Sequence, residues 1–224
     1  MALPEPAIVM LKPVLTKAKS VFCLGYPDIV MEIGRLEALF DISLHKVNPE
    51  NEFSKHLHGV SYDIPDTEEF FEALGVEEFK CCDLKSLRGC EIVADLNYPQ
   101  DFGQYDLVID PGTIEHCFNI WMAALTASNT VKPGGAIFHD NPLSMVNHGF
   151  YMLSPTWYVD WYQDNGWEII IQAITDHREV FTNFNPIARV KVASELSNMV
   201  LARKPIEAKP MAFPTQSKYK VMLN

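Results

Sequence analysis

The sequence lacks an excess of positive charge. Its 224 residues include 18 lysines and arginines against 29 aspartates and glutamates, a formal net charge of −11 at pH 7. Nucleic-acid backbones and anionic membranes are both bound through basic surfaces, so we expect neither as the main partner. The composition favours a small-molecule substrate instead, and it indicates no particular oligomeric state.

Long apolar runs and paired cysteine motifs are also missing. No apolar stretch reaches the roughly 18 residues of a membrane span, and no basic segment precedes an apolar signal core at the N-terminus. The five cysteines show no CxxC spacing, and Cys23, Cys81 and Cys82 lie in apolar runs. We therefore expect a cytoplasmic protein with reduced thiols in its core.

Apolar runs and helical patterns alternate along the chain, which predicts a layered α/β domain with a mainly parallel sheet. The expected strands cover residues 20–24, 79–83, 91–96, 105–110, 136–138, 167–173 and 198–203. The expected helices cover residues 29–40, 67–74 and 118–130, with another that begins at 155. We expect one domain over 1–204, with an irregular inserted loop near 41–65, and a poorly ordered tail over 205–224.

The stretch from Tyr105 to His116, YDLVIDPGTIEH, joins a buried strand to a polar turn that ends in an acid and an imidazole. In open α/β sheets, ligands bind in the crevice beyond the carboxyl ends of the strands. Asp110, Thr113, Glu115 and His116 are therefore candidates for a binding or catalytic site. A charged turn followed by a helix cap is the alternative interpretation.

Two earlier strands also carry an acid at their carboxyl end, Asp83 and Asp95. Together with GYPD after the first strand, YDLVIDPGTIEH and VKPGGAIFHDN, these segments resemble the class I S-adenosylmethionine-dependent methyltransferases. The likeness is sharpest over residues 75–167, where it is to a bacterial subgroup often associated with polysaccharide genes. It implies a Rossmann-like, doubly wound, seven-stranded sheet, mostly parallel with one antiparallel strand, in the order 3-2-1-4-5-7-6.

The resemblance also implies where the cofactor binds, across the carboxyl ends of the first four strands. Asp83 then accepts hydrogen bonds from the ribose hydroxyls, Asp95 and the Leu96 backbone contact the adenine, and Asp110 borders the cleft. Asp28 is placed to receive the α-ammonium group. The alternatives are a surface acid at Asp83 and a turn cap at Asp95.

The first turn departs from the family pattern. The family has a GxGxG sequence there, whereas this chain retains only Gly25, followed by Tyr26 and Pro27, and proline has no amide hydrogen to donate. Two outcomes stay open. Either the cofactor pocket is a variant one, or the fold no longer binds the cofactor.

Histidines provide the candidates for catalysis, because transfer of a methyl group to a hydroxyl requires removal of its proton. His116 is the candidate base, with Glu115 as its orienting partner. His148 lies in an aromatic segment where the family builds acceptor pockets. Helix capping for His116 and packing for His148 are the alternatives.

We expect no metal ion, but a second constellation keeps Mg²⁺ as an alternative cofactor. Asp110, Asp140 and Asn141 resemble the ligands of magnesium-dependent catechol-type O-methyltransferases. The sequence Asp-Asn-Pro is also a common turn.

The leading hypothesis is a methyltransferase that uses S-adenosylmethionine on a small polar acceptor, a hydroxyl of a sugar or a related metabolite, the sugar being implied by the resemblance alone. The alternative is a non-catalytic binding or scaffold protein that has lost the cofactor. A nucleotide-sugar enzyme on a doubly wound sheet is a third possibility, although no GxGxxG opens the chain.

Overall fold

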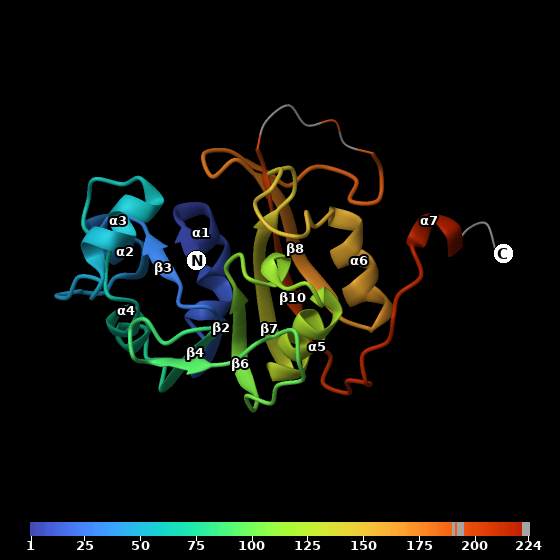
Figure 1. Cartoon of the computed structure of the whole chain (residues 1–224), viewed down its shortest axis with the longest axis horizontal. Helices are drawn as coiled ribbons and strands as arrows, with labels where there is room; N and C mark the ends of the chain where they lie inside the picture. Colours follow the sequence, from blue (N-terminus) through green and yellow to red (C-terminus); the bar gives the residue numbers. More distant parts are fainter. Residues whose placement is uncertain (190, 192–194, 221–224) are drawn as a thin grey trace.

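A central mixed sheet organises the chain in this computed structural model, which describes residues 1–189, 191 and 195–220 (Figure 1). Over these residues the sheet has eight strands in the order β5-β4-β2-β6-β7-β10-β8-β9. Their bounds are β2 Ser20–Leu24, β4 Glu78–Asp83, β5 Glu91–Val93, β6 Tyr105–Asp110, β7 Val131–Pro142, β8 Glu168–Thr175, β9 Val180–Phe181 and β10 Ser197–Arg203.

The sheet contains the strand order that the resemblance implies, with one strand added. Strands β5, β4, β2, β6 and β7 pair in parallel, and β10 is antiparallel to both β7 and β8. The eighth strand, β9, is antiparallel to β8. The expected seven strands with one antiparallel member are thus corrected to eight strands, of which two run against the rest.

The physical reason for the eighth strand is the free edge of β8. A tight turn follows β8, in which Asp176 Oδ1 accepts the amides of Arg178 and Glu179 at 2.9 and 2.8 Å. The chain then folds back and pairs with β8, which covers hydrogen-bonding groups that an edge strand would otherwise expose.

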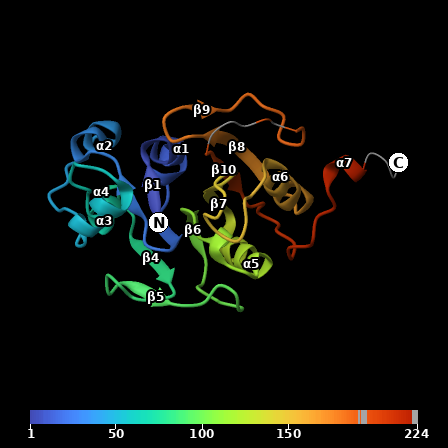
Figure 2. The same ribbon diagram turned by 45° about the horizontal axis from the view of Figure 1, so that its top comes forward.

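Helices cover both faces of the sheet (Figures 1 and 2). Alternate residues of β2 point to opposite faces. Val21 and Cys23 pack with α1 Glu5–Leu15, α2 Ile33–Phe40 and α4 Thr67–Ala73. Phe22 and Leu24 pack with α5 Ile120–Thr130 and α6 Pro155–Asp164 on the other face.

The N-terminal region differs from the expectation in two ways. A second sheet pairs β1 Ala2–Pro4 in parallel with β3 Asp28–Val30, so the helix expected from 29 begins only at Ile33. Helix α1 was not expected, because Pro6 and Pro13 obscure its pattern. Pro6 lies in the first turn, where its missing amide hydrogen costs nothing.

The segment near 41–65 is not the irregular loop that the sequence suggests. It contains α3 Asn51–His58, which ends at Gly59 with a φ of 65°, and it is joined by a bridge between Val47 and Pro65. The helix expected at 67–74 is present as α4, and Asp66 caps it by accepting the Glu69 amide at 2.8 Å.

The tail after 204 also makes defined contacts as far as residue 220, contrary to the expected disorder. Phe213 stacks on Trp121 of α5 with ring centroids 3.7 Å apart, and Ala212 donates its amide to Asn165 at 2.7 Å. The short helix α7 Ser217–Lys220 follows. Residues 221–224 lie outside the described residues.

The cysteines are free thiols, and four of the five are buried, with Cys90 exposed. In the described part of the chain, every helix is too short or too polar to cross a membrane.

Candidate functional site

Two adjoining cavities lie at the carboxyl ends of the parallel strands. The first, of about 210 Å³, is bordered by residues that include Gly25, Asp83, Asp95, Leu96, Thr113 and His116. The second, of about 390 Å³, is bordered by residues that include Glu115, His116, Asp140, His148 and His177. Met1 and His116 line both cavities, so the two meet at these residues.

This position is the topological switch point of the sheet. The chain leaves β2 for β4 on one side and reaches β6 on the other, so the crevice opens beyond the ends of these strands. A larger groove of about 890 Å³ between α1 and the β8 side of the sheet is lined by apolar side chains such as Val9, Met10 and Ile170. None of the strand-end acids lines it, so we place the functional site at the two smaller cavities.

The first turn brings the chain close to Met1. Gly25 has a φ of 86°, and its amide donates to the Cys82 carbonyl at 2.7 Å. A Cβ at this position would lie 2.0 Å from Met1 Cε. The left-handed backbone and this close approach both require glycine, and the Met1 side chain covers the turn.

Asp83 and Asp95 both border the first cavity, as the resemblance implies. Asp83 Oδ1 accepts the Leu84 amide at 2.7 Å. Asp95 Oδ1 accepts the backbone amide and the side-chain amide of Asn97 at 2.9 and 2.8 Å. Asp95 therefore also caps its own turn, which uses part of its capacity to accept hydrogen bonds.

Asp28 lies away from the first cavity, in a buried polar network. Its carboxylate is fully buried and bonds to Asn48 Nδ2 at 2.8 Å, His58 Nε2 at 2.9 Å and Arg88 Nη2 at 3.0 Å. Burial alone would raise the pKa of Asp28, but the His58 hydrogen bond and the Arg88 charge lower it below its usual value. Arg88 also lies over the Tyr26 ring, 4.3 Å from its centroid. Through Arg88, Asp28 therefore helps to hold the first turn in place.

Asp110 is likewise engaged inside the protein. It accepts the Thr113 amide at 2.9 Å, and its other oxygen contacts His139 Nδ1 at 2.7 Å and Asn141 Nδ2 at 3.0 Å. His139 Nε2 in turn lies 2.5 Å from the Tyr162 hydroxyl. This carboxylate ties the end of β6 to β7, and it lines neither cavity.

The three oxygen ligands proposed for Mg²⁺ do not face a common space. The Asn141 side-chain nitrogen donates to Asp110, while its oxygen accepts a hydrogen bond from the Tyr158 hydroxyl. Asp140 Oδ2 lies 3.7 Å from His177 Nε2, and the pKa of His177 is raised mainly by its interaction with the Asp140 carboxylate. The resemblance to a catechol-type magnesium site is thus limited to the sequence.

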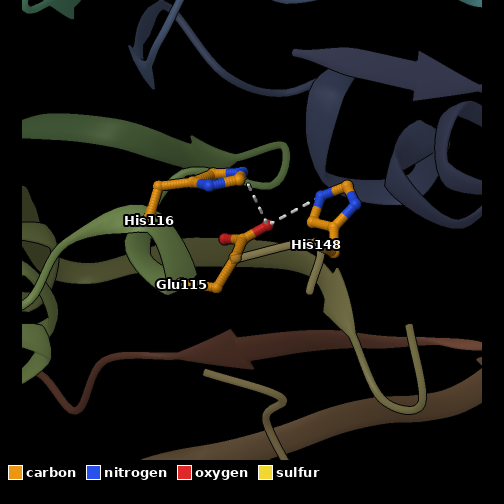
Figure 3. Close-up of side chains that lie close together, drawn as sticks. All are labelled: Glu115, His116 and His148. Atoms are coloured by element: carbon orange, nitrogen blue, oxygen red, sulfur yellow. Dashed lines mark ion pairs between the residues drawn. The ribbon is translucent and has the colours of Figure 1, made fainter. Parts of the chain in front are cut away.

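Glu115, His116 and His148 instead form a compact group, called here the Glu115 cluster. Glu115 Oε1 lies 3.7 Å from His116 Nε2 and 3.6 Å from His148 Nε2. Figure 3 shows both imidazoles directed at this one carboxylate oxygen. The other oxygen, Oε2, accepts a hydrogen bond from Asn141 Nδ2 at 2.9 Å. The second cavity is therefore bordered by a fixed carboxylate with two imidazoles beside it.

Local structure explains why these three groups meet. Glu115 lies in the 3-10 turn η1 Ile114–His116, directly after β6, and its carbonyl accepts the amides of Phe150 and Tyr151 at 2.9 and 3.3 Å. A Cβ on Gly149 would lie 2.9 Å from that carbonyl oxygen. Glycine at this position therefore lets the segment that carries His148 approach Glu115.

Electrostatics in the cluster follow from burial. Burial, followed by the charge of Asp110, raises the pKa of Glu115 to about 8. The pKa of His116 is lowered, first by burial and then by the neighbouring His148. Burial thus disfavours charge on both groups.

The structure groups the candidate residues in two places. Around the first cavity it brings together Gly25, Asp83, Asp95, Leu96 and His116. In the Glu115 cluster it brings together the three catalytic candidates. Met1 and Arg88 also contribute to the site, and no local sequence pattern marks either of them.

No family model matches the chain, and no curated protein matches it. One similar solved structure is of a protein assigned as a sarcosine dimethylglycine methyltransferase from Galdieria sulphuraria, with 11% identity and a TM-score of 0.49, over 90% of this chain and 84% of that one. The StiE O-MT structure has 11% identity and a TM-score of 0.47, over 92% and 75%. The DszA carbon methyltransferase has 12% identity and a TM-score of 0.41, over 90% and 52%. Because these identities are 11–12% and the TM-scores are below 0.5, the functional proposal rests on the geometry of this chain's own residues.

Proposed function

We propose that this chain is an S-adenosylmethionine-dependent methyltransferase that acts on a small polar acceptor. The observation that carries the proposal is the first cavity, where Gly25, Asp83, Asp95 and Leu96 meet at the switch point of the sheet. These are four of the six residues that the resemblance assigns to the cofactor, and the other two, Asp28 and Asp110, do not line this cavity. The four come from three separate strand ends, and a shared cavity is what a common ligand requires.

Each residue has a defined role in this proposal. When bound, S-adenosylmethionine supplies a methyl group on a positively charged sulfur. Asp83 accepts hydrogen bonds from the two ribose hydroxyls, and Asp95 with the Leu96 backbone contacts the adenine. Asp28 and Asp110 act indirectly, because their networks hold the turns after β2 and β6.

The second cavity suits the acceptor. It adjoins the first at His116, which places an acceptor next to the transferred methyl group, and orientation of the two reactants contributes much of the rate in such a displacement. Its imidazole and carboxylate groups fit a hydroxylated metabolite, and His116 is placed to take part in removing the hydroxyl proton. On the sequence resemblance alone, the proposal also includes a sugar as the acceptor and a polysaccharide-related role. It further includes a cytoplasmic location.

A second candidate function is a non-catalytic binding protein that has lost the cofactor. Two observations favour it: Met1 covers Gly25, and Asp28 is held by Arg88 rather than facing the first cavity. The methionine part of the cofactor could bind at this turn only if the Met1 side chain moved.

Calorimetric titration of the purified chain with S-adenosylhomocysteine separates the two functions. We expect saturable one-to-one binding, followed by methyl incorporation in a screen of hydroxylated metabolites. Absence of binding at millimolar ligand would support the non-catalytic alternative, because the intact first cavity would then not accept the cofactor.

A further inference from the structure

One oxygen in the Glu115 cluster has no hydrogen-bond partner among the described residues. The Glu115 side chain is 0% exposed, and its Oε1 accepts no hydrogen bond within the part of the chain that the structure describes. A buried carboxylate oxygen without a partner is costly, and such a group calls for a ligand that completes its interactions.

The neighbours of this oxygen are two imidazole nitrogens. At 3.6 and 3.7 Å, His148 Nε2 and His116 Nε2 are too far from Glu115 Oε1 for hydrogen bonds. The distances instead come close to the spacing between two ligands of one tetrahedral metal ion, roughly 3.4 Å for bonds of about 2.1 Å. One ligand atom from each of the three residues lies within 4.8 Å of the other two.

We propose that Glu115, His116 and His148 bind a divalent transition-metal cation of the Zn²⁺ or Co²⁺ class. Two imidazoles and one carboxylate are a ligand set that suits these ions better than Mg²⁺, which prefers oxygen ligands. The two histidine side chains are 46% and 44% exposed toward solvent, so a cation could enter. A set of three protein ligands leaves a position open toward the second cavity.

The surroundings hold the carboxylate in place for this role. Asn141 Nδ2 donates to Glu115 Oε2 at 2.9 Å, and the same nitrogen donates to Asp110 at 3.0 Å. The Asn141 oxygen is held by Tyr158. Groups of this kind orient metal ligands from outside the coordination sphere, and they keep Oε1 directed at the two imidazoles.

The consequence for catalysis rests on the proposed function. In a methyltransferase, a cation here would bind the acceptor oxygen and favour loss of its proton, so that His116 would act as a ligand rather than as a free base. Binding of the cation itself does not depend on methyl transfer.

The test uses the full chain, stripped with chelator and dialysed. We expect one equivalent of Zn²⁺ to bind with a dissociation constant in the micromolar range or tighter by calorimetry. Co²⁺ should give the visible bands of a four- or five-coordinate site without the thiolate charge-transfer absorption that binding at Cys90 would produce.

The variants His148→Asn and Glu115→Gln should each weaken Zn²⁺ binding at least about a hundredfold, more than the loss typical of groups outside the coordination sphere. His56→Asn is the matched control, because His56 is an exposed histidine on α3 outside the cluster. If Glu115→Gln does not fold, His148→Asn decides alone, since its side chain is partly exposed.

Absence of one-to-one Zn²⁺ binding to the unmodified chain, or equal affinity in the folded His148→Asn variant, would overturn the proposal. Titration of the stripped protein with S-adenosylhomocysteine keeps the two ideas separate. Cation binding without nucleoside binding would leave the metal site standing while the methyltransferase proposal fails, and the reverse result would remove the metal site alone.

Discussion

The substitution Asp83→Asn tests the cofactor proposal at a single atom. Asp83 Oδ1 accepts the Leu84 amide at 2.7 Å, and an asparagine oxygen can keep this bond. The second oxygen becomes an amide nitrogen, which donates rather than accepts and carries no charge. The variant should therefore keep the turn after β4 and lose the acceptor that the ribose hydroxyls need.

The magnitude follows from the number of bonds lost. If Oδ1 remains with Leu84, at least one of the two charge-assisted hydrogen bonds to the ribose disappears, which costs about 1.5–3 kcal/mol. The dissociation constant for S-adenosylhomocysteine should rise about ten- to a hundredfold. Asp83→Ala should weaken binding at least as much, because it also leaves the Leu84 amide without its acceptor.

Calorimetry with both variants gives the measurement, and Asp101→Asn serves as the control. Asp101 is an exposed acid in the loop between β5 and β6, and it does not line the first cavity. The melting temperature of each variant shows that the domain stays folded. Unchanged affinity in folded Asp83→Asn would refute the ribose assignment.

Three further predictions concern catalysis and stability. In His116→Asn, methyl turnover should fall by roughly two to four powers of ten, with affinity for S-adenosylhomocysteine near that of the unmodified chain; full turnover in a kinetic assay would leave this histidine a capping role. Asp28→Asn should lower the free energy of unfolding by about 1–3 kcal/mol in urea at pH 7, because Arg88 loses the charge of its nearer carboxylate partner while it keeps Glu91 Oε1 at 4.0 Å from Nη1. The folded pKa of Asp28 lies below its unfolded value of about 3.9, so the unfolded chain binds more protons in acid. The stability that the Asp28 charge contributes is therefore complete above about pH 3.9 and is lost as the pH falls through the folded pKa. A stability difference between Asp28→Asn and the unmodified chain that does not shrink in acid would contradict the charge assignment. Gly149→Ala should cost about 1–3 kcal/mol by forcing a methyl group against the Glu115 carbonyl, whereas Gly34→Ala, with no atom within 4 Å of its Cβ, should not destabilise the chain; equal melting temperatures would show that the loop yields freely.

The sequence alone determined the layered α/β class and the edge of the sheet where the site lies. Apolar strands of the right length alternate with helical patterns, and the carboxyl ends of parallel strands must share one edge. That rule is local and directional, so the sequence is enough to predict that Asp83, Asp95 and Asp110 lie on the same side of the molecule. The cap of α4 was equally predictable, because Asp66 acts within its own turn.

Tertiary structure decided which of these acids face a ligand and which are used within the protein. Arg88 meets Asp28 although the two are 60 residues apart, and this contact takes Asp28 out of the first cavity. His148 reaches Glu115 because Gly149 permits a close approach between two distant segments. Periodicity records which face of an element is apolar, but it carries no information about the path of a loop or the partner of a buried charge. Such pairings depend on how separate segments pack, and that is settled only when the whole chain has folded.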